Sequence, residues 1–121
     1  MDIPGAFSMK AHDQIIAIGQ VCGWTKCRLT VLGAGGPERK PSPHGIPPGR
    51  NYEVPLPDYL NDLNAMNSAE KVLTDLDKYF DELGWVVYRA GSTRIFSASA
   101  AQRAEAFLKT LNLWVPEKSE P

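Results

Sequence analysis

The sequence predicts a domain of the α/β (α+β) class, a three-layer α/β/α sandwich with a small, mostly antiparallel sheet. Three observations predict it. Apolar residues recur at helical spacing near both ends and in the middle of the chain, one short segment alternates apolar with polar residues, and Gly91-Ser92 separates two runs rich in β-branched and aromatic residues. Helices on both faces of a sheet would cover each apolar stripe. The 121 residues, of which 43% are hydrophobic, suit a single domain.

Composition excludes several classes of protein. The net charge of −1 lacks the basic excess that non-specific nucleic-acid binding needs. We find no apolar run long enough to cross a membrane, and the residues after Met1 lead us to expect no secretory signal. Cys22 and Cys27 read as two ordinary reduced thiols, and neither they nor His12 and His44 have metal-ligand spacing. We therefore expect no metal and no cofactor.

The first third of the chain predicts one helix and one strand. After a frayed leader over residues 1–7, Ser8 can cap a helix and Gly23 can end it. The apolar stripe of that helix comprises Ala11, Ile15, Ile18 and Cys22. Residues 24–32 then alternate apolar and polar side chains, which predicts the first strand of the sheet.

Residues 33–50 form a long basic segment in which five Gly and five Pro fill ten of eighteen positions. Gly33-Ala34-Gly35-Gly36 after a strand suggests a phosphate-binding loop, but that loop needs a helix N-terminus behind it, and Pro37 follows instead. The composition favours a mobile surface loop. The alternative is a partner-binding segment, since Pro-rich chain is pre-ordered. Its basic residues would be Arg39, Lys40, His44 and Arg50.

The middle of the chain predicts a short edge strand and two helices. The strand covers residues 51–54, because Pro55 and Pro57 end a ladder. A Pro-led turn then enters helices over about 60–73 and 75–83, with a capping-box-like restart at Thr74 and an end at Gly84. The segment from Leu56 to Met66 contains this turn and the start of the first of these helices, and we interpret it as a structural element and not as a candidate active site.

The last part predicts a β-hairpin and a final helix. Residues 85–97 would pair across a type II′ turn at Gly91-Ser92, which sets Arg89 opposite Arg94. Ser99 would cap the final helix, with Gln102 as its reciprocal partner. Its core stripe comprises Ala104, Phe107, Leu108 and Leu111, and a polar tail covers residues 117–121.

Three segments carry a family resemblance. They are Leu56-Pro57-Asp58-Tyr59 with Asp62-Leu63-Asn64-Ala65, the final-helix residues 97–108, and Cys22-Gly23-Trp24. Over about two thirds of the chain, leaving out the Gly/Pro segment, the sequence resembles the phage ABA-sandwich domain family. The resemblance implies an α/β sandwich in a bacteriophage or prophage protein acting in the host cytoplasm. The family has no assigned catalysis, so no site residues carry over.

One cluster suggests ligand binding. Arg89, Arg94, Ser97, Ser99 and Arg103 would lie near the hairpin tip and the helix cap, where they could converge on a phosphate or carboxylate. The alternative is two solvated arginines beside an ordinary cap. The carboxylates lie mostly on helix outer faces, and no catalytic pairing is evident.

We therefore expect a non-enzymatic phage accessory protein that binds a host or phage protein, including a component of antiviral defence. The alternative function is a binder that sequesters a phosphorylated or cyclic nucleotide. An exposed edge strand and aromatic residues would also permit a homo-oligomer.

Overall fold

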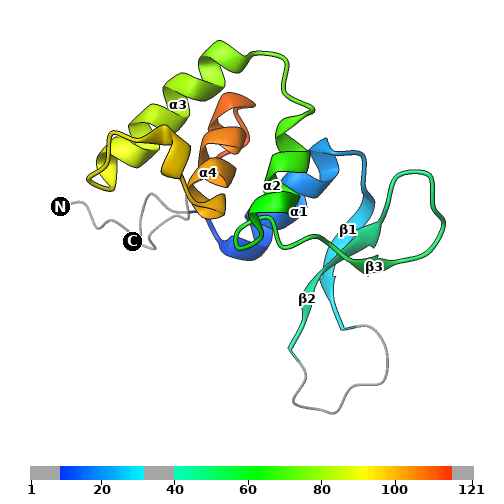
Figure 1. The fold of residues 1–121 in the computed structure, drawn as a ribbon. Helices are drawn as coiled ribbons and strands as arrows, with labels where there is room; N and C mark the ends of the chain where they lie inside the picture. Colours follow the sequence, from blue (N-terminus) through cyan, green and yellow to red (C-terminus); the bar gives the residue numbers. More distant parts are fainter. Residues whose placement is uncertain (1–8, 32–39, 116–121) are drawn as a thin grey trace.

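The structure, a computed structural model, describes residues 9–31 and 40–115 (Figure 1). The described chain holds α1 (Ala11–Val21), α2 (Leu63–Glu70), α3 (Leu76–Arg89) and α4 (Ala100–Thr110). Three strands accompany them: β1 (Thr25–Thr30), β2 (Ser42–Ile46) and β3 (Val54–Pro55). The α+β class is confirmed. The predicted leader, the Ser8 cap, residues 33–39 and the polar tail lie outside the described residues.

The sheet is antiparallel, in the order β1-β2-β3. Its central strand comes from the Gly/Pro segment, so the prediction of a structureless loop is wrong for Ser42–Ile46. Pro43 lies opposite Leu29, and although it has no N–H to donate, its carbonyl accepts a hydrogen bond from Leu56 N at 3.0 Å. A register irregularity between Thr25 and Arg28 accompanies the positive φ of 51° at Lys26.

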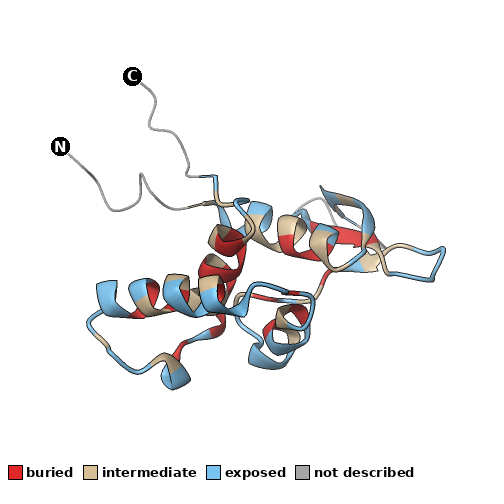
Figure 2. Ribbon diagram, turned by 90° about the horizontal axis from the view of Figure 1, so that it is seen from above, coloured by how far each residue is buried: buried red, intermediate tan, exposed pale blue. Residues whose placement is uncertain are grey.

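The sheet and the other helices meet at α1. Helix α1 contacts β1 and β2 and also packs against α4, which in turn contacts α2 and α3. Ile18 of α1 and Phe107 and Leu108 of α4 are fully buried, and Figure 2 shows buried residues along the inward faces of the helices. The three-layer arrangement is not confirmed, because α3 has α4 as its main packing partner. The sheet extends from one side of the helical cluster (Figure 1).

The predicted hairpin over residues 85–97 is wrong, because α3 continues through Gly84 to Arg89. The buried side chains of α3 are Tyr79, Leu83, Val86 and Val87, and this spacing is that of one helix face. Gly91, with φ 90°, ends the helix instead of turning a hairpin. Its N–H donates to Tyr88 O at 2.9 Å and Ser92 N–H donates to Val87 O at 3.0 Å, the two bonds of a Schellman motif.

The other helix boundaries follow from capping. Asp62 accepts hydrogen bonds from the backbone N–H groups of Asn64 and Ala65, so α2 starts later than predicted and ends at Glu70. Asp75 caps α3 through Lys78 N at 3.0 Å. The capping box of Ser99 and Gln102 at the start of α4 is present as predicted. Among the described residues, no helix is long and apolar enough to cross a membrane.

Candidate functional site

The residues of the predicted anion cluster come from α3, the segment after it and α4, and not from a hairpin tip. Arg89 ends α3, and its Nη2 pairs with Glu105 Oε2 of α4 at 2.5 Å. Arg94 is exposed in the segment between α3 and α4, where its N–H donates to Ser92 Oγ. Ser97 ends the short 3-10 helix η2 (Ile95–Ser97), while Ser99 is occupied as the cap of α4. Because residues 85–89 are helical, Arg89 and Arg94 are not the cross-strand partners that the sequence predicted.

Arg103, the last member of that cluster, belongs to a partly buried network. Its Nη1 lies 3.2 Å from Glu70 Oε2, and its Nε donates to Ala98 O at 3.2 Å. The Tyr79 hydroxyl donates to the same Glu70 oxygen. Burial raises the pKa of Tyr79 well above its usual value, and the Glu70 carboxylate adds to the effect. This network joins α2, α3 and α4.

The basic residues of the Gly/Pro segment are likewise dispersed. Arg39 lies outside the described residues. Lys40 and Arg50 are exposed, and Arg50 N–H donates to Pro47 O at 3.1 Å in a turn. His44 is only 5% exposed in β2, with Nδ1 2.9 Å from Ser42 O. His44 thus belongs to the sheet, and Lys40 and Arg50 alone of these four are placed at the described surface.

The outer face of α3 carries an exposed aromatic surface. The exposed fractions of Phe80, Trp85 and Tyr88 are 49%, 67% and 64%. The rings of Trp85 and Tyr88 meet edge to face, with centroids 6.0 Å apart and an interplanar angle of 86°. Large apolar side chains that are exposed together on one helix face are typical of interaction surfaces. We call Phe80, Asp81, Gly84, Trp85 and Tyr88 the α3 aromatic face.

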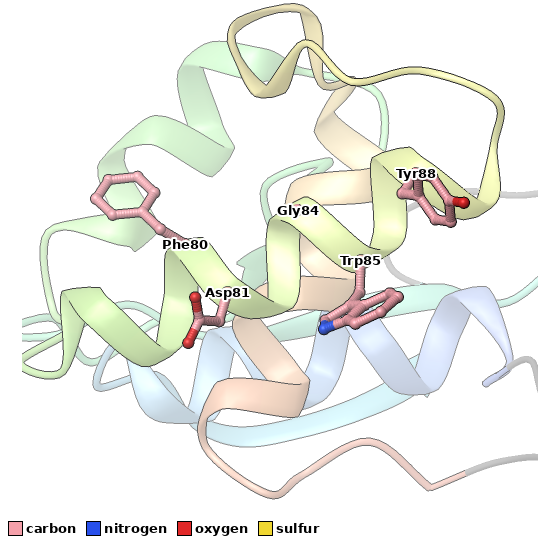
Figure 3. A pocket seen from close by; sticks show the side chains of 5 residues that line it. All are labelled: Phe80, Asp81, Gly84, Trp85 and Tyr88. Carbon is pink, nitrogen blue, oxygen red and sulfur yellow. The ribbon is translucent and has the colours of Figure 1, made fainter.

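A shallow hollow of about 440 Å³ lies in this face, lined by these five residues (Figure 3). Gly84 has no side chain, and Figure 3 shows a bare stretch of helix there between the flanking side chains. Apart from its own helix backbone, a Cβ placed on Gly84 would meet no atom of the described residues within 4 Å, so the described fold does not need glycine at this position. Glycine inside a helix nevertheless costs about 1 kcal/mol relative to Ala. The missing side chain at Gly84 leaves room for the hollow.

Acidic side chains accompany the aromatic rings. Asp81 lines the hollow and Asp77 lies one turn before it, and both are exposed. Neither forms an ion pair with a side chain in the described ranges. The nearest arginine along the helix, Arg89, is already paired with Glu105. Exposed aromatic rings and unpaired carboxylates therefore lie together on α3, and this combination favours the binding of a cationic group.

The sequence interpretation missed this site because it assigned residues 85–97 to strands. The signal was available: Tyr79, Leu83, Val86 and Val87 repeat at helical spacing across Gly84. Continuing the helix through Gly84 would have placed Phe80, Trp85 and Tyr88 outside the core. Within residues 9–31 and 40–115, no three His, Cys, Asp or Glu side chains are grouped to hold a metal ion.

Comparison of the chain with models of protein families, with curated proteins and with solved structures finds no match.

Proposed function

We propose that this chain is a binding protein that acts without catalysis and docks a partner protein on the α3 aromatic face. The observation that carries the proposal is the hollow at Gly84, flanked by exposed aromatic side chains that the fold leaves uncovered among its described residues. The resemblance to the phage ABA-sandwich family supports a host or phage protein as the partner, a component of host antiviral defence included. The site of action would be the host cytoplasm.

The partner segment should be apolar and basic. A Lys or Arg side chain entering the hollow would meet the Asp81 carboxylate and the face of Trp85 or Tyr88. Trp and Tyr are also the residues in which binding energy concentrates at interfaces. Exposed Asp77 extends the negative charge along the same helix. A second copy of this chain fits less well, because two such faces would bring like charges together.

The nucleotide alternative has less support. Of the three arginines in the predicted anion cluster, Arg89 and Arg103 are each paired with a glutamate, and Arg94 carries no ion pair with the described residues. A phosphate would have to displace Glu105 or Glu70 from its arginine.

The test compares capture by matched variants. Host lysate is passed over immobilised wild-type protein, Trp85→Ala, Tyr88→Ala and the control Tyr52→Ala, which removes an exposed aromatic side chain outside the α3 face. We expect one partner to be retained by wild type and Tyr52→Ala, and its capture to fall at least tenfold for Trp85→Ala, as for a central aromatic contact. Replacing Lys and Arg of the partner segment by Ala should weaken binding, and more salt should do the same.

Gly84→Ala makes the test sharper, because folding and binding should change in opposite directions. We expect the free protein to gain up to about 1 kcal/mol of stability, since Ala favours the helix and its Cβ meets nothing. The same methyl group would occupy the hollow and weaken partner binding. Equal capture by wild type, Trp85→Ala and Gly84→Ala would refute the proposal. Self-association through this face, measured by sedimentation and lost in Trp85→Ala, would also overturn it.

A further inference from the structure

A second hollow lies away from the α3 aromatic face, between the end of α1, the residue before β1, the Pro-led turn and α2. We call it the Cys22–Tyr59 groove. Its volume is about 480 Å³, within the range of small-molecule sites. The residues that line it include Cys22, Trp24, Pro57, Tyr59, Asn64 and Ser68. The turn and helix that read as a scaffold in the sequence thus form one wall of a cavity.

The floor of the groove is apolar apart from one polar pair. Tyr59 is 3% exposed, and its side chain lines the groove together with that of Cys22. Burial raises the pKa of Cys22, and interaction with the Tyr59 side chain opposes this in part, so the sulfur is a neutral thiol near neutral pH. A ligand reaching the floor meets a hydroxyl and a thiol, and meets no charge.

The walls keep the groove open. Ala65, Ser68 and Ala69 are small side chains of α2 that line it, so the helix surface is hollowed along that side. The half-buried rings of Trp24 and Pro57 supply flat apolar surface from other segments. The exposed side chains of Asn64 and Ser68 supply amide and hydroxyl groups at the rim. None of the described side chains that line it is charged.

We propose that the Cys22–Tyr59 groove binds an uncharged small molecule built on a flat ring system with a hydrogen-bonding group. The ring would lie against Trp24 and Pro57, and the polar group would reach Asn64, Ser68 or the Cys22–Tyr59 pair. An ionised ligand is disfavoured, because it would lose water without gaining an opposite charge. A few polar groups set in mostly apolar walls are the usual composition of such sites. The inference does not depend on the function proposed for α3.

The native Cys22 thiol gives a direct test. Cys27→Ser protein is incubated under mild reductant with a panel of small-molecule disulfides. The Cys22 thiolate attacks one sulfur of a disulfide, forms a mixed disulfide with that fragment and releases the other half as a thiol. The panel pairs neutral bicyclic rings with the same rings carrying a carboxylate or an ammonium group. Cys22→Ser protein, which keeps Cys27, is the control because Cys27 does not line the groove. The readout is the mass of the intact protein.

We expect neutral-ring fragments to be captured at Cys22 at least fivefold more than their charged partners, with no such preference at Cys27. Ser68→Leu, at an exposed position, should fill the groove and remove the preference while the circular dichroism spectrum stays unchanged. Indole added without any disulfide should shift the NMR signal of the Trp24 side-chain N–H, and less so in Ser68→Leu. Equal capture of neutral and charged fragments, or the same preference at Cys27, would overturn the proposal. Indole shifts that Ser68→Leu leaves unchanged would overturn it as well.

Discussion

Removing the Glu70 carboxylate should destabilise the fold more than any surface charge would. Its Oε2 accepts from the Tyr79 hydroxyl and lies 3.2 Å from Arg103 Nη1. The side chains of Glu70 and Arg103 are each 18% exposed, so solvent screens the pair only weakly. In Glu70→Ala, the buried Tyr79 hydroxyl loses its acceptor and Arg103 loses its counter-charge.

The magnitude follows from these two losses. A buried hydroxyl left without a partner costs about 1–3 kcal/mol. Loss of one partner of a buried ion pair costs about 3–5 kcal/mol when nothing else compensates. Arg103 keeps Ala98 O as an acceptor at 3.2 Å, which lowers that second contribution. We expect a total loss of about 3 kcal/mol, a large part of a typical domain's stability of about 5–15 kcal/mol.

Urea unfolding of wild type, Glu70→Ala, Tyr79→Phe and the double variant measures the effect. The midpoint should fall with little change in slope, since the surface exposed on unfolding stays the same. Glu70→Gln is the matched control, because its amide oxygen can still accept from Tyr79 while the charge is lost, and it should lose less than Glu70→Ala. A loss below about 1 kcal/mol for Glu70→Ala, or strict additivity with Tyr79→Phe, would refute the network as described.

Three further outcomes are expected. Gly19→Ala should lower the free energy of unfolding by about 1 kcal/mol, although Ala has the better helix propensity, because the new Cβ would lie 2.6 Å from Leu56 Cδ2. Thermal unfolding measures this effect, and a rise in melting temperature would contradict it. Ser99→Ala should lose about 1 kcal/mol through the broken capping box, whereas Ser99→Asp should keep most of it. Burial raises the pKa of Tyr59 and of Tyr79, so both stay protonated in the fold while the unfolded chain ionises. Their stabilisation is fully present below about pH 10 and is lost above it, by at most about 1.4 kcal/mol per pH unit for each tyrosine. Denaturation in alkaline buffers should show this fall, with a smaller slope for Tyr79→Phe; a flat profile would exclude it.

Short-range signals in the sequence were enough to predict α4, β1 and α1. The Ser99–Gln102 box and the apolar stripe containing Phe107 and Leu108 identified α4, the helix at the centre of the core. The residues after Trp24 predicted the position of β1, although its burial does not alternate and Leu29 is 46% exposed. The spacing before Cys22 predicted α1. Each of these signals acts over a few residues, where the backbone's own preferences and the side-chain period suffice.

Tertiary contacts decided the rest. Ser42–Ile46 became the central strand because β1 and β3 pair with it on both sides, which the Gly- and Pro-rich composition of residues 33–50 does not indicate. Residues 85–89 have strand-like composition, yet packing against α4 holds them in α3 because helical spacing buries Val86 and Val87 together.

Both candidate sites depend on such contacts. The α3 aromatic face exists only because the helix runs past Gly84, and the Cys22–Tyr59 groove exists only because α1, the Pro-led turn and α2 meet. The sequence by itself determined which residues are aromatic, small or acidic. The tertiary structure decided which of them remain exposed, because burial depends on partners that are distant in the chain.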